Sequence, residues 1–525
     1  ASNNTAVGRS TLNANTTGSE NTAVGTLSLD TNTTGTNNAS FGYDSLSANT
    51  TGVSNTALGD SALKANTTAS NNTAVGQSAL LANTTGDLNV AVGSAALDAN
   101  TVGDRNVAIG SNALTTFNPS SNADTYNTAV GALSLKNLTT GTLNTAVGGQ
   151  AMELATTGGS NVAMGYGALN ANTTGGNNVA IGTGALDANT TASNNTVVGK
   201  DAATANTTGD AMTAIGFGAL ANNTTAANNT AVGYIALISN TTGANNTAVG
   251  KSALDACTTG GSNTALGADA LSSDTLGSRN VAIGTSALEV QNFTSATNSY
   301  NVAIGFNAGA AVTTGINNTI MGGLAGDAIT TASSNTALGY FALGGASLAS
   351  ANTAVGSGAL AAHNVGSLAQ TFNVAVGFDA GNAVTTGVNN TLIGGLSGDA
   401  ITTGGDNVAV GTSALGANTT ASNNIAIGSS ALAANTTGTG NIAMGRNTLI
   451  ANTTANYNTG VGHNTLDANT TGAENTAVGF AALGANTTGA NNVSVGAASG
   501  DAITTGANNV AIGYNSLTTA TTVSD

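Results

Sequence analysis

Residues 4–20 read NTAVGRSTLNANTTGSE, and residues 21–37 read NTAVGTLSLDTNTTGTN. The pattern Asn-x-Ala-x-Gly returns thirty times between Asn4 and Gly513, with few departures such as Met212 in place of the Asn. The step is 17 residues and lengthens to 21 only three times. A fixed short period over a whole chain is typical of solenoid proteins. We number each copy from its Asn, which is position 1.

The apolar and glycine positions of the repeat predict which side chains face inward. Position 5 is Gly in all thirty copies, which predicts a corner with positive φ. Position 4 is large and apolar in every copy, as in Val7, Val24 and Leu58, and position 9 is Leu in 23 copies. We predict that both positions fill the interior. Short apolar stretches between Gly and Asn favour strands joined by turns over helices.

A paired change links position 9 to position 12. In five copies the Leu at position 9 is lost and the Asn at position 12 becomes Val312, Ile329, Val384, Ile401 or Ile503. Apolar volume therefore moves between two positions that share one interior space. We predict that the usual Asn at position 12 also points inward and hydrogen-bonds along the axis as a ladder. Cys257 takes this position as a small buried residue, whereas Asp274 conflicts with an inward position.

The charged residues are confined to a few positions of the repeat. Of 32 charged residues, 31 fall at positions 6, 7, 10, 12, 16 or 17, and the exception is Asp124. Because burying an unpaired charge is costly, we predict that each coil has two solvent-exposed edges, which carry these positions. Positions 2–3 and 13–15 are free of charge and small, so they predict a strip that packs against a second copy of the chain. The alternative is a solvated threonine face.

Composition argues against several classes of function. The net charge is −16, from 24 acidic and 8 basic residues, which disfavours a nucleic-acid groove. The sequence has no apolar stretch of the length that inserts into a membrane. His363 and His463 lie 100 residues apart and the carboxylates occur singly, so we expect no catalytic residues, no metal site and no cofactor. The chain is therefore not expected to be an enzyme.

Three motifs resemble known surface fibres: NTAVG at 4–8 and 21–25, NVAIG at 106–110 and 280–284, and ANTTG at 14–18 and 82–86. They are similar to the head repeats of trimeric autotransporter adhesins and to the 17-residue Asn-Thr-rich repeats of phage-type tail fibres and bacterial surface proteins. The resemblance implies a left-handed parallel β-roll with three chains side by side. The membrane anchor with its coiled-coil stalk and the C-terminal chaperone domain of these families have no counterpart in the sequence. The predicted fold class is all-β, with one continuous β-solenoid of thirty 17-residue coils over residues 1–525.

Three insertions interrupt the period. They read TTFNPSSNADTYN at 115–127, EVQNFTSATNSYN at 289–301 and AAHNVGSLAQTFN at 361–373. Loops on a solenoid often contact partners. The candidate partner contacts in these loops are Phe117, Tyr126, Phe293, Tyr300, His363 and Phe372. The alternative is that the aromatic before each closing Asn folds over the coil and plugs a widened turn.

These features predict a structural or adhesive extracellular fibre, located on a cell surface or a virion. Expected partners are further copies of the chain, as a homotrimer or an end-to-end filament, because both chain ends lie near a repeat boundary without a cap. A host surface or glycan is the expected ligand. The alternative function is an ice-binding solenoid that uses threonine rows at position 2, such as Thr5 and Thr22, although Val90 and Val107 interrupt the row.

Overall fold

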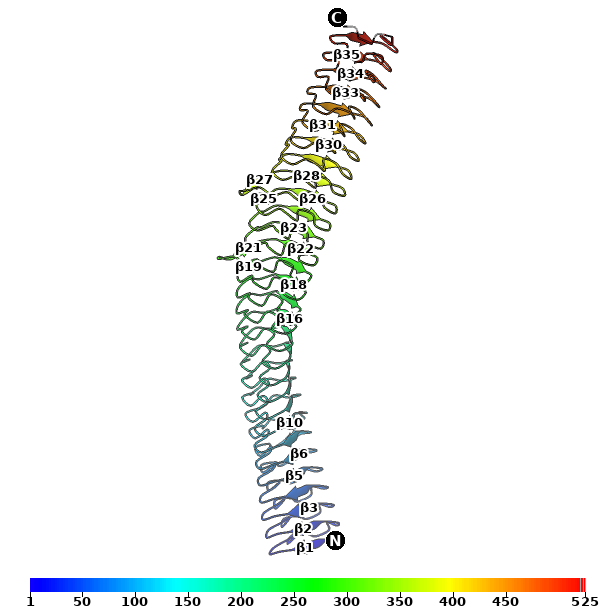
Figure 1. The fold of residues 1–525 in the computed structure, drawn as a ribbon. Helices are drawn as coiled ribbons and strands as arrows, with labels where there is room; N and C mark the ends of the chain where they lie inside the picture. The colour runs from blue at the N-terminus through cyan, green and yellow to red at the C-terminus, as the bar shows by residue number, and fades with distance from the viewer. Residues whose placement is uncertain (520, 523, 525) are drawn as a thin grey trace. The chain divides into compact units, whose positions relative to one another are not determined.

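The computed structural model describes residues 1–519, 521, 522 and 524. Regular secondary structure in this part of the chain consists of 36 short strands joined by turns, with no helix (Figure 1). The chain divides into two compact units, Ala1–Ser262 and Asn263–Asp525. Each unit is a parallel β-solenoid built from the same coil, as predicted. The continuity of one solenoid across residues 1–525 stays a prediction.

Each coil contributes one three-residue strand at positions 2–4. In unit 1 these strands are β1 (Thr5–Val7), β2 (Thr22–Val24), β3 (Ala39–Phe41), β4 (Thr56–Leu58), β5 (Thr73–Val75), β6 (Val90–Val92), β8 (Val107–Ile109), β10 (Thr128–Val130), β11 (Thr145–Val147), β12 (Val162–Met164), β13 (Val179–Ile181), β14 (Thr196–Val198), β15 (Thr213–Ile215), β16 (Thr230–Val232) and β17 (Thr247–Val249). In unit 2 they are β18 (Thr264–Leu266), β20 (Val281–Ile283), β22 (Val302–Ile304), β23 (Thr319–Met321), β24 (Thr336–Leu338), β26 (Thr353–Val355), β28 (Val374–Val376), β29 (Thr391–Ile393), β30 (Val408–Val410), β31 (Ile425–Ile427), β32 (Ile442–Met444), β33 (Thr459–Val461), β34 (Thr476–Val478), β35 (Val493–Val495) and β36 (Val510–Ile512).

Within each unit, neighbouring strands pair in parallel and in register. Thr5 lies opposite Thr22, and Ala6 lies opposite Ala23. The register survives the insertions, since Val107 pairs with Thr128, 21 residues away. Identical positions therefore form columns along each unit, which confirms the predicted stacking of the coils.

The three insertions form small extra sheets with the coil before them. β7 (Gly103–Asp104) pairs with β9 (Ala123–Asp124), β19 (Gly277–Ser278) pairs with β21 (Thr297–Asn298), and β25 (Ala349–Ser350) pairs with β27 (Ala369–Gln370). In unit 2 the segments at β21 and β27 project from the stack of coils (Figure 1). The extra residues thus leave the coil as loops that are anchored at positions 15–16 of the preceding coil.

Side chains alternate along each strand, and this corrects one prediction. Ala74 at position 3 and Leu80 at position 9 are fully buried, which confirms position 9 as core. Position 4 does not face the interior: Val7 is 57% exposed and Leu58 is 48% exposed. Because successive residues of a strand point to opposite faces, the inward alanine at position 3 forces its neighbour at position 4 outward.

The glycine corner and the buried leucine both occupy the left-handed region of backbone conformation. Gly8 at position 5 has φ +137°, and a Cβ there would lie 2.6 Å from the carbonyl oxygen of Gly25. Leu80 at position 9 has φ +52°. This conformation costs a non-glycine residue about 1–2 kcal/mol, while burying a leucine returns about 1.5–3 kcal/mol. Leucine therefore tolerates the position because its side chain fills the core.

The five copies with Gly at position 9 confirm the predicted exchange of volume. Gly309 keeps the left-handed backbone, with φ +57°. A Cβ there would lie 3.3 Å from Cγ2 of Val312 and 2.9 Å from Cδ1 of Ile320. The apolar side chain at position 12, together with the inward residue of the next coil, occupies the space that leucine fills elsewhere.

Two columns of buried asparagine stabilise the coils, and only one of them was predicted. At position 12, Asn32 Nδ2 donates to Asn15 Oδ1 at 2.9 Å and to the Gly35 carbonyl at 3.0 Å, which confirms the ladder. At position 1, the backbone N–H of Asn21 donates to Asn4 Oδ1 at 2.9 Å, and Asn21 Nδ2 donates to the Gly35 carbonyl at 2.9 Å. The position-15 carbonyl of Gly35 thus accepts hydrogen bonds from both columns.

The exceptional residues at position 12 are also buried. The Cys257 thiol donates to the Gly260 carbonyl at 3.4 Å, in the manner of the usual amide. Asp274 is 1% exposed and accepts hydrogen bonds from the Gly277 N–H at 2.9 Å and from Gln291 Nε2 at 2.7 Å. Burial raises the pKa of the Asp274 carboxyl, and the Gln291 hydrogen bond opposes that rise. Position 12 therefore faces inward even where an acid occupies it.

Candidate functional site

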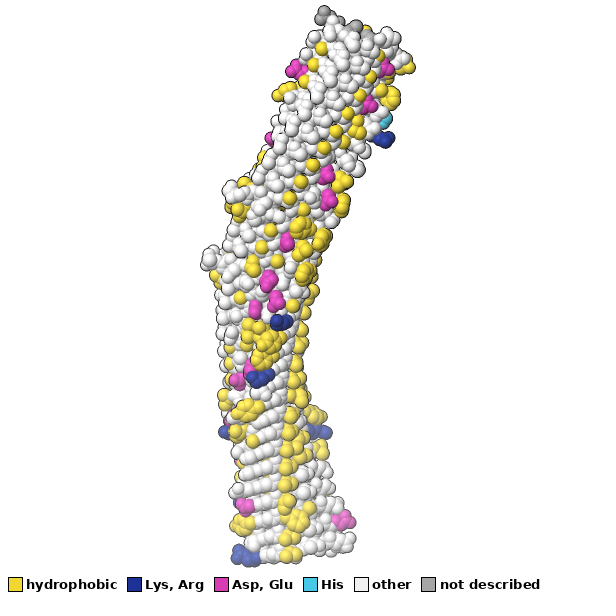
Figure 2. Space-filling view, in the orientation of Figure 1, with side chains coloured by type: hydrophobic (Ala, Val, Ile, Leu, Met, Phe, Trp, Pro, Cys, Tyr) yellow, Lys and Arg dark blue, Asp and Glu magenta, His cyan; other side chains and the backbone are white. Residues whose placement is uncertain are grey.

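A column of large apolar side chains lies on the surface of each unit. We call the position-4 side chains the apolar stripe; there are fifteen in unit 1 and fifteen in unit 2. Phe41, Ile109 and Met164 are 38%, 39% and 43% exposed. Yellow side chains mark the stripe in Figure 2. Monomeric proteins rarely leave a contiguous apolar patch of this kind open to water, so the stripe is a candidate contact surface.

The strip that was predicted from positions 2–3 and 13–15 is not one surface. Position 3 is inward, as in Ala74, and position 15 is covered, as in Ala69. At position 13 the Thr33 hydroxyl donates to the Thr50 carbonyl at 2.9 Å, so this row bonds along the solenoid. The charge-free outward face of the sheet instead consists of position 2 and position 4.

The structure divides the six candidate loop residues into two groups. Phe117 and His363 are fully buried at position 12, and Phe293 is 6% exposed. Their side chains lie inside the loops and are not free to contact a partner. Tyr126, Tyr300 and Phe372 directly precede the closing Asn, as position 17 does in a coil without an insertion, and they are 49%, 47% and 54% exposed. The aromatic before the closing Asn is therefore not the plug, and contact of these three with a partner stays a prediction.

A buried hydroxyl anchors the end of each insertion to the position-1 column. Thr125 Oγ1 donates to Asn106 Oδ1 at 2.8 Å, and Ser299 Oγ donates to Asn280 Oδ1 at 2.7 Å. The third insertion repeats the bond from Thr371 to Asn352 at 2.8 Å. Sequence reasoning missed these residues, although a Ser or Thr precedes the aromatic in all three insertions.

An arginine of the preceding coil holds the first two insertions. Arg105 Nε donates to Asp124 Oδ1 at 2.6 Å, and the guanidinium lies 5.8 Å from the centre of the Tyr126 ring. Arg279 Nη1 donates to the Tyr300 hydroxyl at 2.6 Å and lies 5.5 Å from that ring. Asp124 raises the pKa of the Arg105 guanidinium. These contacts hold the two tyrosines against their own coils.

The third insertion has no such arginine, because Ala351 stands at that position. A surface hollow of about 320 Å³ lies there, with Ala351, Leu368 and Gln370 among its lining residues. Leu368 is 63% exposed. Phe372 therefore lies on a more open loop than its two tyrosine counterparts.

His363 fills position 12 beneath this third loop. Its Nε2 lies 3.0 Å from Thr371 Oγ1 and 3.4 Å from Asn373 Nδ2. Burial lowers the pKa of the imidazole to about 4, and the nearby backbone of Thr385 opposes that shift. The side chain thus takes the place of an amide in a polar interior and is neutral at ordinary pH.

Position 6 faces water, as predicted, and its aromatics stack where they are consecutive. The Phe217 and Tyr234 rings are 5.5 Å apart and close to parallel, and Lys200 Nζ lies 5.5 Å from the centre of the Phe217 ring. His463 stacks on Phe480 at 5.7 Å in unit 2. These rings form short exposed columns on the edge of the coils.

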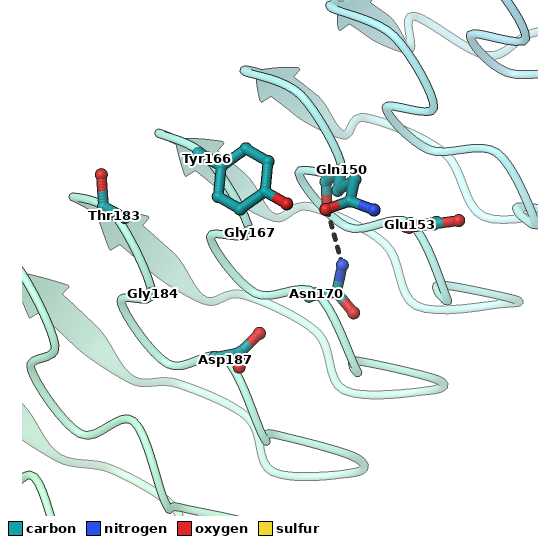
Figure 3. A pocket seen from close by; sticks show the side chains of 8 residues that line it. All are labelled: Gln150, Glu153, Tyr166, Gly167, Asn170, Thr183, Gly184 and Asp187. Atoms are coloured by element: carbon teal, nitrogen blue, oxygen red, sulfur yellow. Dashed lines mark hydrogen bonds between the residues drawn. The ribbon is translucent and has the colours of Figure 1, made fainter.

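A second hollow, of about 360 Å³, lies on the same edge in unit 1. Successive coils contribute positions 6, 7 and 10, and the eight lining residues are Gln150, Glu153, Tyr166, Gly167, Asn170, Thr183, Gly184 and Asp187 (Figure 3). Asn170 Nδ2 donates to the Gln150 carbonyl at 2.9 Å. The hollow is therefore polar, with one aromatic ring at its rim.

No protein-family model matches this chain, and no curated protein matches it. Its functional assignment therefore depends on the surfaces described above.

Within the described residues, no three His, Cys, Asp or Glu side chains lie close enough together to hold a metal ion. The described chain also has no helix with the length and apolar character needed to cross a membrane.

Proposed function

We propose that this protein is a structural or adhesive subunit of an extracellular fibre on a cell surface or virion, and that it has no catalytic activity. The observation behind this proposal is the apolar stripe, which repeats in coil after coil on an in-register sheet. Covering such a stripe requires another long surface of the same period. A second copy of the same chain provides one, so we propose self-association along the stripe.

The distribution of polar groups supports a structural rather than catalytic role. Buried asparagines pair with one another or with the backbone and so have structural partners. The buried Asp274 is hydrogen-bonded to Gln291, and the buried His363 lies beneath a loop with a depressed pKa. A regular stack of coils stiffens a fibre, because each coil is bonded to its neighbours by backbone, threonine and asparagine columns.

Charging the stripe tests the proposal. The triple substitution Val147→Lys, Met164→Lys and Ile181→Lys places cations on consecutive outward positions of unit 1. Light scattering after size exclusion should give three or more copies of the 49.9 kDa chain for the wild type and a lower mass for the variant. The resemblance to trimeric adhesins favours three copies.

The matched control places three lysines at position 6, as Ser94→Lys, Ser111→Lys and Thr183→Lys. This position already holds Lys200 and Lys251, so the coil accepts the side chain. The control should keep the wild-type mass. A wild-type protein that is monomeric at micromolar concentration would overturn the proposal.

One observation favours ice binding as a second candidate function. Threonines at position 2, such as Thr56 and Thr73, lie on the outward face of the in-register sheet. Under the fibre proposal this face is covered and the wild type should show no thermal hysteresis. Clear ice shaping that is lost in the triple lysine variant would replace the fibre proposal.

A further inference from the structure

The hollow of about 360 Å³ in unit 1 exists because two consecutive coils have glycine at position 7. Gly167 and Gly184 are the only such consecutive pair in the sequence. A Cβ on Gly167 would meet only Asp187 Oδ1, at 3.9 Å, so the space above this residue is open. The missing side chains leave a groove between the column at position 6 and the column at position 10.

Opposite walls of this groove differ in chemistry. On one side stands Tyr166, which is 61% exposed and leans toward Gly149, with 3.5 Å between ring Cδ2 and a Cβ built there. On the other side, consecutive coils place Glu153, Asn170 and Asp187 at position 10. Strand spacing puts the two acidic positions roughly 10 Å apart, with the amide between them. In Figure 3 the Asn170 oxygen lies on the side away from Gln150.

We propose that this groove binds a neutral sugar ring of a glycan, which stacks on Tyr166 and donates hydroxyl hydrogen bonds to Glu153, Asn170 and Asp187. An exposed aromatic face suits the apolar C–H face of a pyranose. Carboxylates accept two hydrogen bonds per group, and bonds to charged acceptors are about twice as strong as neutral ones. The volume of about 360 Å³ falls at the lower end of the range of small-ligand sites, roughly 300–1,000 Å³.

The charges around the groove select against acidic sugars. Glu153 and Asp187 face it, and Lys136 lies 3.9 Å from Glu153 on the side of the preceding coil. Beyond Gly184 lies Asp201, which is paired with Lys200 at 2.7 Å. Partial burial also raises the pKa of the Asp187 carboxyl, which an added anion would raise further. A uronate would meet like charge here, whereas a neutral hexose would not.

This inference deepens the adhesive side of the proposed function, and it shares no residue with the apolar stripe. The test uses the full chain, with cellohexaose, maltohexaose and mannohexaose as neutral probes and a guluronate hexamer as the acidic probe. Titration calorimetry should show saturable binding of at least one neutral probe and none of the guluronate. Tyr166→Ser and Gly167→Asn should each weaken that binding about tenfold or more, equivalent to about 1.4 kcal/mol.

The variants are chosen so that the coil stays intact. Asparagine already occupies position 7 at Asn112 and Asn307, with φ +53° and +54°, so Gly167→Asn fills the groove without straining the backbone. The matched control is Tyr340→Ser, at position 6 of a coil whose position 7 is Phe341 and not glycine. It should bind as the wild type does.

Three results would overturn the sugar site: no saturable binding of any neutral probe, tighter binding of the guluronate, or unchanged binding by Gly167→Asn. Light scattering on the same samples separates this outcome from failure of the fibre proposal. The triple lysine variant of the stripe should form a smaller assembly by light scattering and should bind the sugar as the wild type does.

Discussion

Single buried amides account for much of the cohesion between coils. Asn223 Nδ2 donates to Asn206 Oδ1 and to the Ala226 carbonyl, both at 3.0 Å. Its own Oδ1 accepts from Asn240 Nδ2 at 2.7 Å. The adjacent Asn222 is exposed at position 11, where alanine is the usual residue. These two neighbours allow a buried amide to be compared directly with an exposed one.

We predict that Asn223→Ala destabilises its coil by about 1–3 kcal/mol, because it leaves buried groups on Asn206 and Asn240 without their partner. Hydrogen exchange of the peptides around residues 206–240 should report faster local opening. Asn222→Ala should leave exchange unchanged. Equal exchange in the two variants would show that the ladder adds nothing to stability.

His363 predicts a local loss of stability in acid. Its folded pKa of about 4 lies below the ordinary value of 6.5, so the opened coil takes up a proton before the folded coil does. The contribution is fully present above pH 6.5 and is lost as pH falls toward 4, a change of roughly 3 kcal/mol. After correction for the intrinsic slowing of exchange in acid, the protection of residues 352–373 against hydrogen exchange should fall over this range.

His363→Gln is the matched variant, because Gln291 takes the same position in the second insertion. In the variant, the protection of this coil against hydrogen exchange should be the same at pH 6.5 and at pH 4. A loss of protection of the same size in both proteins would assign the effect to the nearby acids instead.

The sequence was informative about residues where two positions changed together. The exchange between Leu at position 9 and Val or Ile at position 12 placed both in the core, and Gly309 with Val312 shows why. Position 1 is almost always Asn, so no paired change revealed its column. The prediction that Val7 faces the interior was wrong because the sequence does not distinguish a large apolar residue in a core from one on an open contact surface.

At the scale of elements, the three insertions are versions of one loop with different restraints. Arg105 and Asp124 clamp the first loop, Arg279 and Tyr300 clamp the second, and the third lacks an arginine. Exposed ion pairs and exposed cation–π contacts add little to the stability of a fold. The clamp should therefore order its loop with little effect on the coil beneath.

We predict that Arg105→Ala raises the rate of limited proteolysis within residues 118–125 several-fold while the global unfolding transition stays within about 0.5 kcal/mol of the wild type. Residues 364–370 of the unclamped third loop give an internal reference and should be cleaved readily in both proteins. Arg446→Ala, at an exposed position 6, is the control. Unchanged cleavage of the first loop would mean that Thr125 and Phe117 alone hold it.

The positions of these loops could be predicted from the period, but their interior could not. Counting from Asn106 places Phe117 at position 12, and counting from Asn352 places His363 there, so both buried residues follow the rule of the coil. Phe293 falls at position 14, where most coils have Thr and no other coil has an aromatic residue. Its burial depends on the folded path of the loop, which periodicity does not describe.

For the molecule as a whole, each coil bonds mainly to the coil before it and the coil after it. Stability in such an array is close to a sum of coil and neighbour terms, so damage should remain near its origin. A Cβ on Gly148 at position 5 would overlap the carbonyl of Gly165 in the next coil, whereas one on Gly149 would make ordinary contacts, with the Tyr166 ring at 3.5 Å and the Ala132 carbonyl at 3.9 Å. Gly148 is therefore packed against the next coil, whereas the adjacent Gly149 lies at the edge and has room for a side chain.

We predict that Gly148→Ala opens the coils around residues 127–178 and leaves coils far from them, such as residues 21–54, with wild-type protection in hydrogen exchange. Its left-handed backbone, with φ +138°, adds strain to the overlap. Gly149→Ala should behave as the wild type. Loss of protection throughout unit 1 would show that the unit unfolds as one cooperative block.

The four-residue insertions have a practical consequence for protein engineering. Val281 still pairs with Val302 and Thr353 with Val374, so the inserted residues between these strands do not change the register of the sheet. A foreign peptide that ends in a hydroxyl residue, an aromatic and Asn should therefore be accepted at either place. Two such grafts in unit 2 would lie four coils apart, roughly 19 Å by strand spacing. The stack of coils would then display epitopes at chosen spacings along its axis.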